Sequence, residues 1–241
     1  MLPTLAIRAF NIIGKPFGIN PFPRAFTNVV TEAATDRRSA FDRIYKGVGW
    51  PAAESRSGVG SDSKRTATYL GQLDRCLDEL KVSTLFDAPC GDLNWIGPVA
   101  AKRGYIGGDV SAALIDDLHR SHPQIDTRLF DICDSEFPAA DLWHCRDCLF
   151  HLPIADIRLA FENFARSSIP YALLTTHRSR WLHRNLDVPI GGFRYLDLQK
   201  APFNLPAPIR ALLDYRPMID FPRFMGLWQR EQIVAALAAW R

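Results

Sequence analysis

The sequence predicts a doubly wound α/β fold built on a mostly parallel sheet. Three observations support this prediction. Short apolar strands alternate with amphipathic helices from about Lys64 onward, a glycine turn follows the first strand at residues 84–87, and acidic residues recur where strands end. Repeated βα units put helices on both faces of a sheet and ligands at the carboxyl ends of its strands. The acids expected there are Asp87, Asp109, Asp131 and Asp147.

Length and composition indicate one domain with attachments. The chain has 241 residues, 47% of them hydrophobic, which is enough for one large core. Its net charge of +3 is too small for a surface that binds duplex nucleic acid. Five cysteines, an odd number, are not the framework of a small secreted module, so we expect a reducing compartment, by default the cytoplasm.

The first 63 residues are expected to form an N-terminal arm and a flap. Residues 2–19 are apolar, but Arg8 and Lys15 interrupt the pattern of a signal peptide, and two glycines and a proline leave no membrane span. An amphipathic helix packed on the domain and one lying on a membrane surface both stay open. Residues 20–60 contain few periodic runs and read as an irregular arm.

A Gly/Ser-rich turn at residues 57–63 leads into a predicted amphipathic helix over 64–80. The turn lacks the Gly-Lys-Ser/Thr ending of a phosphate-binding P-loop. It is either a flexible lead into a capped helix or a flap over the ligand. Apolar residues at helical spacing define the buried face of this helix, namely Leu70, Leu73, Leu77 and Leu80.

After the central turn, helix and strand signals alternate to about residue 175. Ser111 is the N-cap of one predicted helix, and Pro153 stands at the start of another. The helices are expected over 94–102, 111–121 and 154–167, and the strands over 105–109, 127–131, 141–145 and 171–175.

The central turn has the features of a ligand-binding turn. Pro89 fixes φ, Gly91 allows close backbone approach, and Asp87 is placed to accept hydrogen bonds from a cation. Asp109, at the end of the next strand, can accept both hydroxyls of a ribose. The pyrophosphate motif Gly-x-Gly-x-x-Gly is absent and Asp92 would repel a phosphate, so a ligand with a ribose and no phosphate fits best.

Four motifs follow one another at the expected strand ends, namely P-C-G-D (89–92), G-G-D-V (107–110), F-D-I-C-D (130–134) and C-R-D-C-L-F-H-L-P (145–153). Together they resemble the class I S-adenosylmethionine-dependent methyltransferases. The resemblance covers about residues 64–177 and implies a Rossmann-like, seven-stranded sheet whose last strand is antiparallel, near residues 224–228. The first turn departs from the acid-x-Gly-x-Gly-x-Gly pattern of that family, because only Gly91 keeps its place.

The resemblance also implies a cofactor site for S-adenosylmethionine. It assigns Asp87 and Gly91 to the methionine end, Asp109 to the ribose, and Asp131 with Ile132 to the adenine. Further residues of the same motifs are assigned to this site, namely Pro89, Val110 and Arg146.

Methyl transfer from a sulfonium is an in-line displacement, so the enzyme mainly holds donor and acceptor close, aligned and dry. An oxygen acceptor would gain from a general base near the end of the fourth strand, where His151, Asp147, His177 and His144 are candidates. His151 is equally well explained as a polar residue before a helix. The Asn/Asp-Pro-Pro-aromatic motif of amino-directed methyltransferases is absent, which favours oxygen.

Residues 64–241 are thus the expected methyltransferase domain, with 177–220 as an acceptor lid or, alternatively, a solvated cover. The arginines and aromatic rings of residues 177–220 suit a polar small molecule or a glycan as acceptor. The acceptor residues expected there are Arg178, Trp181, Arg194 and Tyr195.

Two other functions stay open: a nucleotide-dependent oxidoreductase and a non-catalytic binding domain of the same fold. Cys145 and Cys148 lack a second pair at metal-ligand spacing, so no metal is expected.

Overall fold

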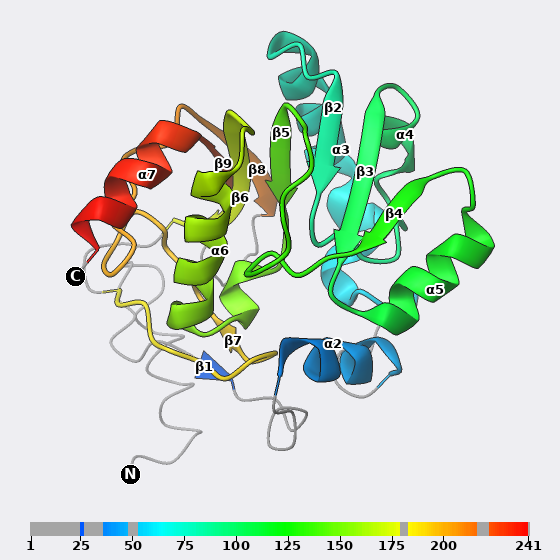
Figure 1. The fold of residues 1–241 in the computed structure, drawn as a ribbon, viewed down its shortest axis with the longest axis horizontal. Helices are drawn as coiled ribbons and strands as arrows, with labels where there is room; N and C mark the ends of the chain where they lie inside the picture. The colour runs from blue at the N-terminus through cyan, green and yellow to red at the C-terminus, as the bar shows by residue number, and fades with distance from the viewer. Residues whose placement is uncertain (1–24, 27–35, 48–52, 179–182, 216–221, 241) are drawn as a thin grey trace.

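The computed structural model describes residues 25–26, 36–47, 53–178, 183–215 and 222–240. Seven strands form the main sheet in the order β4-β3-β2-β5-β6-β9-β8 (Figure 1). The strands from β2 to β6 are mutually parallel, and β9 runs antiparallel to both of its neighbours. The strands are β2 (Thr84–Asp87), β3 (Gly104–Asp109), β4 (Asp126–Leu129), β5 (Leu142–Cys145), β6 (Tyr171–His177), β8 (Arg210–Tyr215) and β9 (Arg223–Gln229). This sheet confirms the predicted architecture, including the antiparallel strand near residues 224–228.

Helices cover both faces of the sheet, and α2 lies beyond the carboxyl ends of the parallel strands (Figure 1). A separate two-stranded ribbon pairs β1 (Ala25–Phe26) with β7 (Phe193–Arg194). Short 3-10 turns occupy η3 (Val59–Ser61) and η4 (Leu149–His151). The helices are α2 (Arg37–Tyr45), α3 (Ser63–Glu79), α4 (Gly97–Ala100), α5 (Ala112–Ser121), α6 (Ile154–Arg166) and α7 (Arg230–Ala239).

The core is split by the sheet into two apolar layers. One layer joins α6 and α7 to the sheet through Trp143, Phe161 and Trp228, all of them buried. The other joins α3 and α5 to the opposite face through Leu73 and Leu114. Burial of both sheet faces explains why the central strands β2, β5 and β6 are largely apolar in the sequence.

Local signals set most helix boundaries as expected. The Ser111 hydroxyl accepts from the Leu114 amide at 3.3 Å and caps α5. Pro153 precedes α6, and α3 matches its prediction within one residue at each end. The helix expected over 94–102 is shorter, because only Gly97–Ala100 is helical, with Pro98 in its first turn.

Two segments expected to be irregular contain regular elements. The arm over 20–60 contains α2, whose N-cap Asp36 accepts a hydrogen bond from the Ser39 amide at 2.9 Å. The range 177–220, expected as a lid, includes strand β8, which pairs with β9 in the main sheet. Residues 2–19 lie outside the described residues. Within the described ranges, no helix combines the length and the apolar character that crossing a membrane requires.

Candidate functional site

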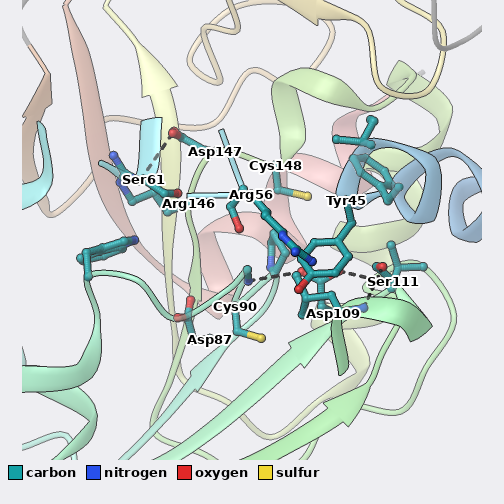
Figure 2. A pocket seen from close by; sticks show the side chains of 18 residues that line it. Tyr45, Arg56, Ser61, Asp87, Cys90, Asp109, Ser111, Arg146, Asp147 and Cys148 are labelled. Atoms are coloured by element: carbon teal, nitrogen blue, oxygen red, sulfur yellow. Dashed lines mark hydrogen bonds and ion pairs between the residues drawn. The ribbon is translucent and has the colours of Figure 1, made fainter. Parts of the chain in front are cut away.

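A pocket of about 780 Å³, its open mouth included, lies at the carboxyl ends of β2, β3 and β5 (Figure 2). Six of the eight residues predicted to bind a cofactor line it: Asp87, Pro89, Gly91, Asp109, Val110 and Arg146.

Asp109 joins the first two turns of the site. Its Oδ2 accepts from the Gly91 amide at 3.3 Å and its Oδ1 accepts from the Ser111 amide at 3.0 Å. Gly91 has φ +57, a conformation that favours glycine, and a Cβ there would overlap the Ser57 side chain. Burial raises the pKa of Asp109 to about 6, although these amides favour its charged form.

Asp87 is held by a buried chain of hydrogen bonds. Its Oδ2 accepts from the Tyr105 hydroxyl at 2.7 Å, and its Oδ1 lies 2.6 Å from Nδ1 of His144. Nε2 of His144 lies 2.8 Å from the Tyr69 hydroxyl. Both ring nitrogens of His144 are therefore committed to protein partners, and we assign His144 to orienting Asp87 rather than to acting as a base.

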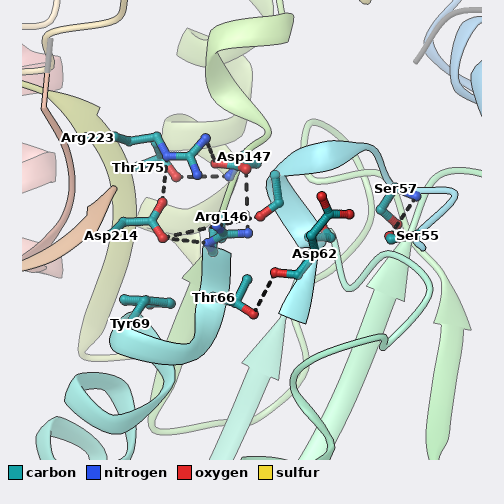
Figure 3. A network of polar contacts seen from close by, with 12 residues as sticks. Ser55, Ser57, Asp62, Thr66, Tyr69, Arg146, Asp147, Thr175, Asp214 and Arg223 are labelled. Carbon is teal, nitrogen blue, oxygen red and sulfur yellow. Dashed lines mark hydrogen bonds and ion pairs between the residues drawn. The ribbon is translucent and has the colours of Figure 1, made fainter. Parts of the chain in front are cut away.

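A square of charges, in which Arg146 and Asp214 are buried and Asp147 and Arg223 are half-buried, closes one end of the pocket (Figure 3). Arg146 lies 3.0 Å from Asp214 and 3.5 Å from Asp147, and Arg223 lies 2.6 Å from Asp214 and 2.9 Å from Asp147. Burial alone would raise the pKa of Asp147, but the two guanidinium groups outweigh it and lower that pKa. The guanidinium of Arg146 also lies 5.1 Å from the ring centre of Trp95, another pocket residue.

Residues 53–62, called the flap below, overlap the predicted turn and border the pocket through Arg56, Ser57 and Ser61. The Asp92 carboxylate accepts from the Ser55 hydroxyl at 2.9 Å, the Arg56 amide at 2.8 Å and the Ser57 hydroxyl at 3.2 Å. On the other side, Arg146 donates to the Gly60 carbonyl at 2.8 Å. A Cβ on Gly60 would overlap the Asp147 carboxylate, so glycine lets the flap reach this wall.

Of the predicted catalytic residues, Asp147 lines the pocket, whereas His151 and His177 are buried and are not among its lining residues. Nδ1 of His151 lies 2.6 Å from the Gly192 carbonyl, which can only accept, so the proton sits on Nδ1. Nδ1 of His177 accepts from the Leu196 amide at 3.2 Å. Burial lowers the pKa of His151 to about 4 and that of His177 to about 3, so both rings are neutral at pH 7.

The other predicted site residues lie elsewhere. Asp131 and Ile132 do not line this pocket, and Asp131 forms an ion pair with Arg37 of α2 at 2.7 Å. Arg194 and Tyr195 are buried, and burial lowers the pKa of Arg194 to about 10. Arg178 is exposed and its guanidinium lies 5.2 Å from the ring centre of Phe224. Trp181 lies outside the described residues.

One wall of the pocket was not predicted from the sequence. Three side chains of α2, Phe41, Ile44 and Tyr45, line it. Their spacing of three and four residues, after a capping residue at Asp36, is a helix signal that could have found them.

Comparison with solved structures finds the same fold in methyltransferases. The 1,6-didemethyltoxoflavin-N1-methyltransferase of Burkholderia thailandensis, solved with S-adenosylhomocysteine, matches with TM-score 0.57 and 13% identity over 80% of this chain and 86% of that one. Magnesium protoporphyrin IX methyltransferase from Synechocystis PCC 6803, solved with bound SAM, matches with TM-score 0.53 and 14% identity over 82% and 99%. No protein-family model matches the chain, and no curated protein matches it in sequence. At these identities the likeness concerns the fold.

Proposed function

We propose that this protein is a methyltransferase that uses S-adenosylmethionine as methyl donor. One observation carries the proposal: Asp87, Gly91 and Asp109 converge on one pocket at the carboxyl ends of β2 and β3. The fold around that pocket is shared with proteins solved with S-adenosylmethionine or its demethylated product.

The residues present fit this donor. Asp109 offers a buried carboxylate for ribose hydroxyls, and its raised pKa reflects an acid that lacks the partners to offset its burial. The charged end of the pocket, with Asp87 and Arg146, suits an amino-acid moiety, and the opposite end is apolar. When bound, the donor supplies an electrophilic methyl group on sulfur.

The protein's own contribution is to orient the reactants and exclude water. The flap, which precedes the sheet in the chain and is held by Asp92 and Arg146, covers part of the pocket. For the acceptor we propose an oxygen of a polar small molecule or a glycan, with His151, neutral at pH 7, as the group that takes its proton and Asp147 and His177 as the other candidates. Arg178, Trp181, Arg194 and Tyr195 remain our proposed acceptor residues.

Isothermal titration calorimetry tests the donor. The native chain should bind S-adenosylmethionine, and Asp109→Ala should weaken binding by about 1.5–3 kcal/mol, the range for hydrogen bonds to a charged group. Asp116→Ala, an exposed acid on α5, is the matched control and should bind like the native chain. No binding by the native chain, or tight binding of NAD instead, would overturn the proposal. A screen of acceptors with labelled donor would then identify the methylated atom.

A further inference from the structure

The two ends of the pocket differ chemically. Arg146 and Asp147 lie toward one side of the view in Figure 2, and Tyr45 and Ser111 lie toward the other. The charged side is the one closed by the square of ion pairs. The other side is lined by apolar side chains from α2 and the start of α5, namely Phe41, Ile44, Tyr45 and Leu114.

The α2 side chains form one continuous face that meets the flap. Positions 41, 44 and 45 are neighbours on a helix surface. The guanidinium of Arg56, which belongs to the flap, lies 5.3 Å from the ring centre of Tyr45. The Tyr45 hydroxyl donates to Asp117 at 2.8 Å, which fixes the ring from the α5 side. A planar cation and two aromatic rings thus surround the apolar end.

Helix α2 is fastened in this position from both sides. Arg37 pairs with Asp131 at 2.7 Å and with Asp156 at 3.4 Å, and the Asp42 carboxylate accepts from the Ser111 hydroxyl at 2.6 Å. The second oxygen of Asp131 accepts from the Cys133 amide at 2.9 Å. Both oxygens of Asp131 therefore have protein partners, and Asp131 serves to hold α2.

We infer that the face of α2 carrying Phe41, Ile44 and Tyr45, closed by Arg56, is the subsite for the flat base of the donor, and that Asp131 acts on this subsite only through Arg37. The inference rests on the proposed function. Its physical basis is that nucleobases stack on aromatic rings and on guanidinium planes, and that an apolar slot rewards a flat ligand. The specificity of the site would then depend on an element that precedes the sheet in the chain.

Calorimetry with two ligands, S-adenosylhomocysteine and adenosine, tests the subsite. Phe41→Ala and Arg56→Ala should each weaken both ligands by a similar factor, about tenfold for a lost stacking contact. Arg38→Ala, an exposed arginine of the same helix, should change neither affinity. The side chain of Arg56 is 67% exposed, so Arg56→Ala should fold even if Phe41→Ala does not.

The other end of the pocket sets the orientation. Trp95→Leu should weaken S-adenosylhomocysteine and leave adenosine binding unchanged, because adenosine has no amino-acid moiety. If Trp95→Leu weakens adenosine and the α2 variants do not, the base lies at the charged end and the inference is overturned.

A double-mutant cycle separates the two roles of Asp131. If it acts through Arg37, then Arg37→Ala and Asp131→Ala should weaken adenosine equally, and the double variant no further. A larger loss in Asp131→Ala than in Arg37→Ala would mean direct contact with the base and would overturn that part of the inference.

If the native chain binds S-adenosylhomocysteine while Phe41→Ala and Arg56→Ala bind it with native affinity, the subsite is wrong and the proposed function stands. If the native chain binds neither ligand, both fail.

Discussion

At the scale of single residues, Asp109 links the geometry of the site to pH. Its pKa of about 6 in the folded chain lies above the usual range for an aspartate because the carboxylate is buried. A raised acid pKa means that folding favours the protonated form, so its contribution to stability is present at low pH and is lost as pH rises through 6. Ribose hydroxyls favour the ionised form, so they offset this cost.

Donor affinity should therefore rise with pH. Between pH 5 and pH 7 we expect the binding constant of S-adenosylhomocysteine to increase about tenfold, since roughly a tenth of Asp109 is ionised at pH 5 if its pKa is near 6. Calorimetry at several pH values measures this slope. Asp109→Asn is the control and should bind weakly with little pH dependence. A native affinity that is flat over this range would contradict a ribose contact by Asp109.

His151 is the residue on which the proposed proton transfer depends. His151→Ala should lower kcat by about 10²–10⁴ and leave donor affinity near native. Because its pKa is about 4, the native pH–rate profile should show no histidine step between pH 5.5 and 8. The charges of Asp147 and Arg223 act on His151, so removing its ring could also disturb the fold. The melting temperature of the variant checks this. Unchanged turnover would leave positioning as the whole mechanism.

How well single residues could be predicted depended on whether their partners are close in sequence. Gly91 and Asp109 were predictable because a strand, a turn and the next strand end carry them in order. The partners of Asp87 were not, since His144 is 57 residues away and its own partner Tyr69 comes from α3. The ion pair between Arg37 and Asp131 joins residues 94 positions apart. No local sequence pattern predicts such contacts.

At the scale of elements, the first part of the flap is held by one carboxylate. Asp92 holds residues 55–57 by three donors, whereas the sequence suggested only that it would repel a phosphate. Asp92→Ala should release the flap, so amide hydrogen exchange should accelerate at residues 53–62 and stay native in β2 and β3. Donor affinity should fall about tenfold, as for the loss of one charge-assisted hydrogen bond. Asp116→Ala is again the matched control. Native exchange in the flap of Asp92→Ala would show that Arg146 and Gly60 suffice to hold it.

Elements with their own start and stop signals were predicted well. Ser111 and Pro153 placed α5 and α6, and apolar runs placed β2, β3 and β5. The short helix α2 and strand β8 were missed. In β8, Leu212 and Asp214 are both buried, and a buried acid in a strand reads as a loop until its partners Arg146 and Arg223 are known.

At the scale of the whole molecule, the site lies at the centre of the sheet, and the edge formed by β9 and β8 also contributes residues to it. Strands β8 and β9 lie beyond β6, yet Asp214 of β8 and Arg223 of β9 meet Arg146 and Asp147 just after β5 (Figure 3). The charged end of the pocket is therefore assembled from segments about 70 residues apart. Doubly wound topology could be predicted from alternation alone, because each βα unit is local. The contacts of Asp214 and Arg223 with the site could not be predicted in this way, because β8 and β9 follow an irregular segment.

A single substitution in the square of charges should cost a large part of the stability of the fold. The side chain of Asp214 is fully buried between Arg146 and Arg223, so Asp214→Ala takes one counter-ion from the buried guanidinium of Arg146 and one from the half-buried guanidinium of Arg223. We expect the free energy of unfolding to fall by about 3–5 kcal/mol, the cost of removing one partner from a buried ion pair. Urea unfolding measures it. Asp78→Ala, which removes an exposed partner of Arg103, is the matched control and should cost under about 1 kcal/mol. Asp214→Asn keeps the shape and some hydrogen bonds, so it should fall between the two. Equal losses in Asp214→Ala and Asp78→Ala would show that water or neighbouring groups compensate the two arginines, and that the far edge of the sheet is held by its backbone pairing and apolar contacts instead.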